Sequence, residues 1–574
     1  MQMQERRSKI LTAAIAVFYV VACLWVTPHG FDAGDTGALL AQYAQPLNPA
    51  ESISIGTFLT VWTGHWINAI LPFGQLYVFS LLAWVLFGAE AFLVYRVLRP
   101  YLPSTVLAAL TVGGVFMNKF FDLLGYNNWT IFWFIVMLAL LDQWMRSDRL
   151  GWLFAAGCMV GISMGFRLPN ILQGLMVLGV FWYVWHSRSF RKAWGEALLY
   201  CAGIVVSIAA VWGSYAAYYG LDALASKLPG YANRLGQSTS IGYSAEEMLT
   251  ALFTGLVSGA LMALAAMLAI CIAAWLICRL TKNGAALRTL AVAGCSVLLT
   301  AGLACSVMNF TSAEWLNVRR PSLCLIAAFS LLVCLGCAFL FAKRDPHFST
   351  LCVFAVGMIL IVTLGTNNGT LFFMMGMMYS VPMAAAGVMR VGALLRQSRV
   401  PRWSGEAVTL TKIVGMALFC TLAVFNFFTY EYLDLRAWNT TESIAIPEFA
   451  GMKTTEQRSA MYEEFVELTQ DQQGEPLLLY GSFPIGFYLS EMEPATGQIW
   501  MDLDSYSLEQ MDEALDGLEE EQEWPVVIFA YTFGPDYRYG LDKWERLEQF
   551  VTDNEYGISY ESPFFRMYEK NEGK

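Results

Sequence analysis

Residues 30–74 of the chain read GFDAGDTGALLAQYAQPLNPAESISIGTFLTVWTGHWINAILPFG and follow directly on the first long apolar run. A connector of this length with its own residue pattern is usually functional. Two acidic residues, Asp32 and Asp35, open the stretch. Two amphipathic segments, GALLAQYAQPL and GTFLTVWTGHWINAIL, come next, and such segments favour a position along a membrane interface. The stretch therefore predicts a structured loop at a membrane surface.

Asp35 lies between Gly34 and Gly37, a few residues after the apolar run. Because glycine adopts backbone conformations that other residues avoid, we expect these two positions to let the loop turn tightly. A carboxylate held there would stand at the boundary between water and lipid. The alternative interpretation of Asp35 is a helix N-cap or turn carboxylate in front of GALLAQY.

The 574-residue chain is 57% hydrophobic and only 14% charged, with a mean hydropathy of +0.49. This composition excludes a disordered chain, a collagen-like fibre and a small disulfide scaffold. Thirteen apolar runs approach the ~20 residues that cross a hydrocarbon core as a helix. The sequence predicts an α-helical polytopic membrane protein with about thirteen spans. The runs lie at 10–27, 76–95, 104–118, 130–145, 151–166, 171–186, 197–219, 255–278, 289–308, 322–342, 350–366, 371–389 and 411–430.

The distribution of Lys and Arg predicts the orientation of the chain in the membrane. Cytoplasmic loops carry an excess of basic residues. With the N-terminus inside, the inner loops and ends of residues 1–430 hold 20 basic residues and the outer ones hold 6. We therefore expect a cytoplasmic N-terminus and, after an odd number of spans, an extracytoplasmic C-terminal part.

The C-terminal part differs in charge from the rest of the chain. Residues 431–574 contain 31 of the 46 acidic residues and carry a net charge of −22, whereas residues 1–430 carry +11. We expect a membrane domain over 1–430, with its first outer loop at 28–75, and a small α/β domain over 431–574. Helical patterns alternate there with apolar strand patterns. The expected helices lie at 455–471, 505–520 and 541–552, the strands at 475–480 and 526–533, and a hairpin at 557–569.

Polar side chains are costly in a membrane, so those on the predicted outer side are candidates for a site. A cavity with carboxylates and a few cations suits a phosphate-bearing substrate. Asp122 is a candidate for acceptor binding or an interfacial cap, and His65 is either an aromatic-belt residue or a ligand. The cationic candidates for a phosphate are Arg167, Arg234, Arg319 and Arg320. Arg319 and Arg320 could instead extend toward the membrane surface.

The order of these features resembles the C-type glycosyltransferase superfamily, polytopic enzymes that use polyprenyl-phosphate sugars. It includes the protein O-mannosyltransferases and the aminoarabinose transferases of lipid A. The shared features are one span, a large outer loop that opens with acidic residues, interfacial helices, and a soluble α/β tail. The segment Gly34-Asp35-Thr36-Gly37 is similar to the Gly-Asp pattern of a bacterial branch. Because Thr36 follows Asp35, the adjacent Asp-Glu pair of many members is missing, and the choice between Asp32 and Asp35 stays open.

The resemblance implies transfer of a sugar, with inversion, from a polyprenyl-phosphate donor to an extracytoplasmic glycan, lipid or protein. Asp35 or Asp32 would act as the general base. The leaving phosphate would be bound by cations chosen from Arg167, Arg234, Arg319 and Arg320, with Lys119 and Lys227 as further candidates. The expected partners are the lipid-linked sugar, the acceptor and the bilayer, without nucleic acid. No cofactor and no metal ligand is assigned. The expected location is a bacterial plasma membrane.

Two other classes of protein fit parts of the pattern. A secondary transporter is expected to show internal repeats, and no period relates the halves of this chain. A lipid-linked polysaccharide polymerase or ligase would place its large outer loop late in the chain, whereas here it comes first.

Overall fold

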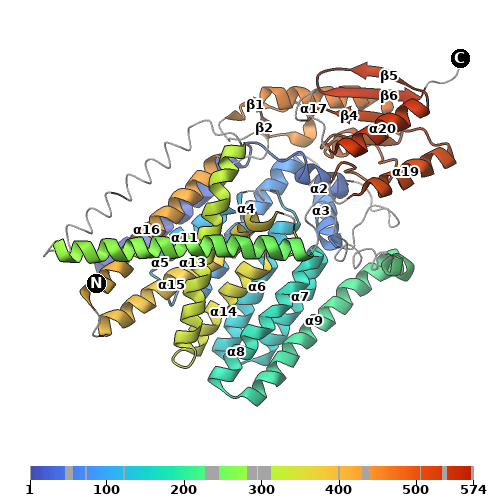
Figure 1. Ribbon diagram of the computed structural model, residues 1–574. Helices are drawn as coiled ribbons and strands as arrows, with labels where there is room; N and C mark the ends of the chain where they lie inside the picture. The colour runs from blue at the N-terminus through green and yellow to red at the C-terminus, as the bar shows by residue number, and fades with distance from the viewer. Residues whose placement is uncertain are drawn as a thin grey trace.

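The computed structural model describes residues 2–44, 56–71, 74–119, 123–226, 245–280, 294, 312–366, 368–398, 401–429, 439–503, 506–532 and 540–570. Long helices form a bundle, and a small domain with a sheet lies at one end of it (Figure 1). The predicted fold class, a polytopic helical protein with a small C-terminal α/β domain, is confirmed.

The bundle consists of apolar helices that follow the predicted runs. They are α1 (Gln2–Val26), α4 (Gln75–Leu98), α5 (Ser104–Met117), α6 (Tyr126–Ser147), α7 (Leu150–Phe166), α8 (Val177–Ser187) with the 3₁₀ helix η2 (Leu168–Met176) before it, α9 (Phe190–Tyr219), α11 (Ala245–Leu280), α13 (Ser312–Phe341), α14 (Pro346–Ile361), α15 (Phe373–Gln397) with the 3₁₀ helix η3 (Gly369–Phe372) before it, and α16 (Arg402–Thr429).

Within the described residues, nine helices are long and apolar enough to cross a membrane. Three shorter apolar helices, α5, α7 and α14, accompany them. Together these correspond to twelve of the thirteen predicted runs. The remaining run, 289–308, falls almost wholly outside the described residues.

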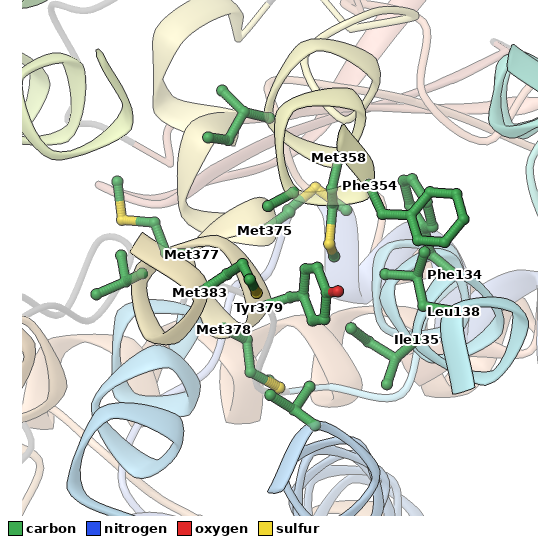
Figure 2. Close-up of a cluster of buried hydrophobic side chains, with 14 of the residues drawn as sticks. Phe134, Ile135, Leu138, Phe354, Met358, Met375, Met377, Met378, Tyr379 and Met383 are labelled. Atoms are coloured by element: carbon green, nitrogen blue, oxygen red, sulfur yellow. The ribbon is translucent and has the colours of Figure 1, made fainter. Parts of the chain in front are cut away.

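The centre of the bundle is rich in methionine. Helix α15 contributes Met375, Met377, Met378 and Met383, which belong to one hydrophobic cluster with Phe134 and Leu138 of α6 and Phe354 and Met358 of α14 (Figure 2). The most apolar window of α15 is 83% buried, the highest value among the nine long helices. The unbranched methionine side chain adapts to irregular gaps. Helix α15 is therefore the helix around which the others pack.

The C-terminal domain contains a four-stranded sheet of order β3-β4-β6-β5, with β3 and β4 parallel and the other pairs antiparallel. The predicted strands, helices and hairpin are present, and a two-stranded sheet and one short helix were not predicted. The elements are β1 (Glu442–Ser443), 3₁₀ helix η5 (Pro447–Phe449), β2 (Lys453–Thr454), α17 (Glu456–Thr469), 3₁₀ helix η6 (Gln470–Gln472), β3 (Leu477–Tyr480), α18 (Gly486–Ser490), α19 (Leu508–Glu521), β4 (Val526–Ala530), α20 (Leu541–Asp553), β5 (Tyr556–Glu561) and β6 (Phe565–Lys570).

Both faces of this sheet are covered. Side chains such as Leu478 and Val527 face α19 and α20, while Leu477 and Ile528 belong to a second cluster on the other face. That second cluster also includes Phe31 from the loop after α1 and residues of α4. Successive side chains of a strand point to opposite faces. One face of the sheet therefore packs on α19 and α20, and the other packs on α17 and belongs to the cluster that includes the bundle residues.

The first outer loop lies between the bundle and this domain. Its two amphipathic segments form α2 (Asp35–Ala44) and α3 (Phe58–Ile70). The start of the loop is also bonded to the domain, because the N–H of Lys453 donates to the carbonyl of Pro28 (2.6 Å) and the N–H of Gly30 donates to that of Lys453 (2.9 Å). The loop that opens with Asp32 and Asp35 is therefore held from two sides.

Candidate active site

Asp32 and Asp35 lie at the beginning of α2. The carboxylate of Asp32 accepts the backbone N–H groups of Gly34 (2.8 Å) and Asp35 (3.1 Å). Backbone N–H groups at a helix start have no partner within the helix, and a preceding carboxylate satisfies them. The capping role that we considered for Asp35 is therefore performed by Asp32.

The carboxylate of Asp35 has different surroundings. Its side chain is accessible at the surface, and it forms no ion pair or side-chain hydrogen bond with the residues that the structure describes. The dense protein around it nevertheless raises the pKa of Asp35 above its ordinary value. Burial, together with the nearby charge of Asp35, raises the pKa of Asp32 to about 7. The pair thus holds protons more tightly than isolated aspartates.

The two glycines beside Asp35 serve close packing against the C-terminal domain. A Cβ atom on Gly37 would lie 2.7 Å from the backbone nitrogen of Ile485, and one on Gly34 would lie 3.2 Å from the ring of Trp500. Neither glycine has a positive φ angle, whereas Gly30 has one of 77°. Gly34 lies in the turn before α2, as we expected, whereas Gly37 lies within the helix and permits its contact with the C-terminal domain.

Cations gather where η3 meets α15, in the segment Phe372–Met374. The guanidinium of Arg167 lies 5.6 Å from the ring centre of Phe372 and donates to the carbonyl of Gly365 (2.8 Å). Nη2 of Arg319 lies 2.9 Å from Sδ of Met374. Both side chains are buried, with 7% and 1% of their surfaces exposed. Burying two guanidinium groups is costly, so their presence marks a candidate anion site.

Lys119 is a third buried cation, at the end of α5. Asn118, its neighbour at the end of α5, donates its side-chain N–H to the carbonyl of Met374 (3.2 Å). Lys119 itself is buried, lies over the ring of Phe427, and is an electrostatic neighbour of His29. His29 in turn precedes Asp32 by three residues. The last residues of α1 and α5 and the first parts of α13 and α15 thus lie at one end of the bundle, and the loop that carries Asp32 and Asp35 begins there.

The other predicted site residues lie outside this group of buried cations or outside the described residues. Arg320 is exposed on α13, next to the buried Arg319. His65 lies on α3 with Nδ1 at 3.0 Å from the carbonyl oxygen of Tyr43, a contact that ties α3 to α2; its binding of a substrate stays a prediction. Asp122, Lys227 and Arg234 lie outside the described residues. Among the described residues, no three His, Cys, Asp or Glu side chains gather as a metal site would require.

Trp500 and Ile485 are neighbours of the acidic pair that the sequence did not point to. Both come from the C-terminal domain, and their contacts with Gly34 and Gly37 depend on how that domain docks. No local motif marks either residue. The available sequence signal is the pair Gly34 and Gly37, since glycine permits another segment to pack closely against the backbone.

Fold and site together define a polytopic membrane protein with an acidic and cationic region beneath a small extramembrane domain. No family model and no curated protein sequence matches the chain. Solved structures that resemble it include the oligosaccharyltransferase AglB of Archaeoglobus fulgidus in complex with an inhibitory peptide and a dolichol-phosphate. That likeness has 11% identity and a TM-score of 0.47, over 98% of this chain and 74% of the other.

The same oligosaccharyltransferase tethered with an acceptor peptide gives 12% identity and a TM-score of 0.46, over 90% and 69% of the two chains. ArnT from Cupriavidus metallidurans bound to undecaprenyl phosphate gives 12% and 0.45, over 98% of both chains. These likenesses concern the fold alone. A likeness this distant assigns no activity and no role to any residue of this chain.

Proposed function

We propose that the chain is a membrane glycosyltransferase that moves a sugar from a polyprenyl-phosphate donor to an extracytoplasmic acceptor. The observation that carries the proposal is the state of Asp35. Its carboxylate is accessible, has no bonded partner among the described residues, and has a raised pKa. A general base must reach the proton that it removes from the acceptor, and its pKa should lie near the working pH.

The chemistry requires one base and one anion site. Asp35 removes the proton from the acceptor hydroxyl or amine while that atom attacks the anomeric carbon from the side opposite the phosphate. The new glycosidic bond forms as the bond to the phosphate oxygen breaks, which inverts the anomeric configuration. The polyprenyl phosphate leaves as an ion, so no general acid is required.

The leaving phosphate gains charge as the bond breaks, and cations that stabilise this charge lower the barrier. Arg319 and Arg167 supply forked donors that can bind two phosphate oxygens at once, and Lys119 supplies a point charge. All three are buried and lie around the start of α15, on the side of the bundle where Asp35 stands. Asp32, which is engaged with backbone N–H groups, holds the loop in place.

The proposal is tested by extracting lipid from the full chain purified in mild detergent and analysing it by mass spectrometry. We expect polyprenyl-phosphate sugars in the extract and consumption of added donor when an acceptor is supplied. Asp35→Asn should retain the lipid, because the base does not hold the donor. If no such lipid is found and no added donor is consumed, the proposed function is wrong.

A further inference from the structure

Helix α11 is held against the bundle at two separate places. In its first half, a Cβ on Gly255 would lie 2.2 Å from Cγ2 of Thr370 in η3, and one on Gly259 would lie 2.1 Å from the carbonyl oxygen of Cys324 in α13. In its second half, Ala274 packs with Ala407 and Leu410 of α16. Figure 1 shows α11 lying across α13. The middle of α11 therefore bridges the space between α13 and α16.

A cavity of about 680 Å³ lies under this bridge, with walls from α5, α11, α13, α15 and α16. Its lining is apolar apart from a few side chains, and Lys412 is the one charged residue in it among the described residues. Ala266 and Met267 of α11 line the cavity and are also exposed. The cavity therefore opens toward the surrounding membrane.

The cavity lies in the middle of the bundle and extends toward the end that faces away from the C-terminal domain. Its lining residues come from the middle of α16, from Thr411 to Cys420, and from the first half of α5, such as Val106. The segments that meet the acidic and cationic region are the opposite ends of these helices, at Asn118 and Phe427. The cavity is thus separate from the candidate active site.

Two cations lie at the end of this cavity that is remote from the C-terminal domain. Nζ of Lys412 lies 3.6 Å from the position that a Cβ on Gly392 would occupy, five residues before the end of α15. Arg396 follows Gly392 by four residues, so it lies on the same face of α15 one turn nearer the membrane surface. It is exposed and is an electrostatic neighbour of Lys412. Lys and Arg at this depth place their charges among lipid headgroups.

We propose that this cavity binds the acyl chain of an anionic phospholipid from the leaflet opposite the C-terminal domain, with the headgroup phosphate between Lys412 and Arg396. An apolar opening within a bilayer is filled by hydrocarbon, because water there would leave its hydrogen bonds unmade. The two cations select a lipid with net negative charge. The site would anchor α11, which is held to α13 and α16 only at separate places, and so stabilise the bundle.

The test uses the full chain in nanodiscs of phosphatidylcholine alone or with added phosphatidylglycerol. We expect phosphatidylglycerol to raise the unfolding temperature and to be retained in native mass spectrometry. The double variant Lys412→Ala with Arg396→Ala should lower apparent phosphatidylglycerol affinity by about 10-fold. Lys343→Ala, an exposed cation at the same end of the bundle and outside the cavity, is the matched control and should keep wild-type affinity.

A second variant tests the cavity itself. Ala385→Phe places a large ring in the lining and should displace the bound chain even if both cations remain. Equal stabilisation of the wild type by both lipids would overturn the proposal, as would full phosphatidylglycerol affinity in both variants. Loss of bound polyprenol from Ala385→Phe, with phosphatidylglycerol binding unchanged, would also overturn it by showing that the donor chain fills the cavity. Glycosyl transfer is measured separately, so failure of the proposed function leaves this test valid.

Discussion

Asp32 and Asp35 are three residues apart, and their carboxylates have different tasks in the structure. Asp32 accepts two backbone N–H groups, while the Asp35 carboxylate is left accessible at the start of α2. Each carries a raised pKa, that of Asp32 reaching about 7. A carboxylate that ionises only near neutral pH can act as a base there, whereas an ordinary aspartate has a pKa of about 3.9.

The pair predicts an unusual pH dependence. The base must be ionised, so kcat/KM should rise with pH through an apparent pKa above that of an ordinary aspartate, because burial raises the pKa of Asp35. Asp32→Asn should keep this rise, because the base is still present. The folded protein also binds the proton of Asp32 more tightly than the unfolded chain does, so the contribution of this group to stability is present at low pH and is lost as the pH rises through about 7. A pH–rate profile that is flat from pH 5 to 8 would contradict this assignment.

Arg319 and Arg320 are adjacent in the chain, but we expect their replacement to affect the KM for the donor differently. Arg319 is buried beside Met374, and Arg320 is exposed. Arg319→Ala should raise the KM for the lipid-linked donor by about 10-fold or more, since a hydrogen bond to a charged group contributes about 1.5–3 kcal/mol. Arg319→Lys should restore part of this, because the charge remains but the planar fork does not. Arg320→Ala is the matched control and should keep the wild-type KM. If steady-state kinetics give equal KM values for both Ala variants, Arg319 is not part of the anion site.

At the level of elements, α2 is fixed against the C-terminal domain through Gly37. In Gly37→Ala the new methyl group would lie 2.6 Å from Cβ of Ile485 and 2.7 Å from its backbone nitrogen, so α2 or the domain has to move. We expect a loss of about 1–3 kcal/mol in stability from overpacking and a clear fall in transfer rate, because Asp35 shifts with α2. Gly213→Ala on α9, where a Cβ meets nothing within 4 Å, is the control. Thermal unfolding and transfer rates that are equal for the two variants would contradict a positioning role for this contact.

The elements themselves were largely predictable from the sequence, and the contacts between them were not. The stretches EPLLLY and VVIFAYTF predicted β3 and β4, and the apolar runs predicted the long helices, because these patterns are local. Asp32, Asp35 and the arginines were recognised as candidates because charges near a membrane are rare. The proximity of Gly37 to Ile485, or of Asn118 to Met374, depends on tertiary packing, and no periodicity in a single sequence encodes it.

At the scale of the whole molecule, the C-terminal domain and the acidic loop share one end of the bundle. The 20-to-6 distribution of basic residues predicts that this end is extracytoplasmic and that the N-terminus is inside. A phosphatase reporter, which needs an extracytoplasmic location, should be active when fused after Lys574. A reporter that works only in the cytoplasm should be inactive at the same position. If this second reporter alone is active, the predicted orientation is wrong and the acceptor is expected on the other side of the membrane.

The central claim, that Asp35 is the base of a glycosyl transfer, is tested most directly by the rate of transfer in Asp35→Asn. The amide keeps the shape of the side chain and loses the basic oxygen, so transfer should fall by at least ~10²-fold while folding and donor retention stay close to those of the wild type. Asp32→Asn should cost less, because Asp32 orients the loop. Loss of turnover in Asp32→Asn with wild-type turnover in Asp35→Asn would contradict the assignment.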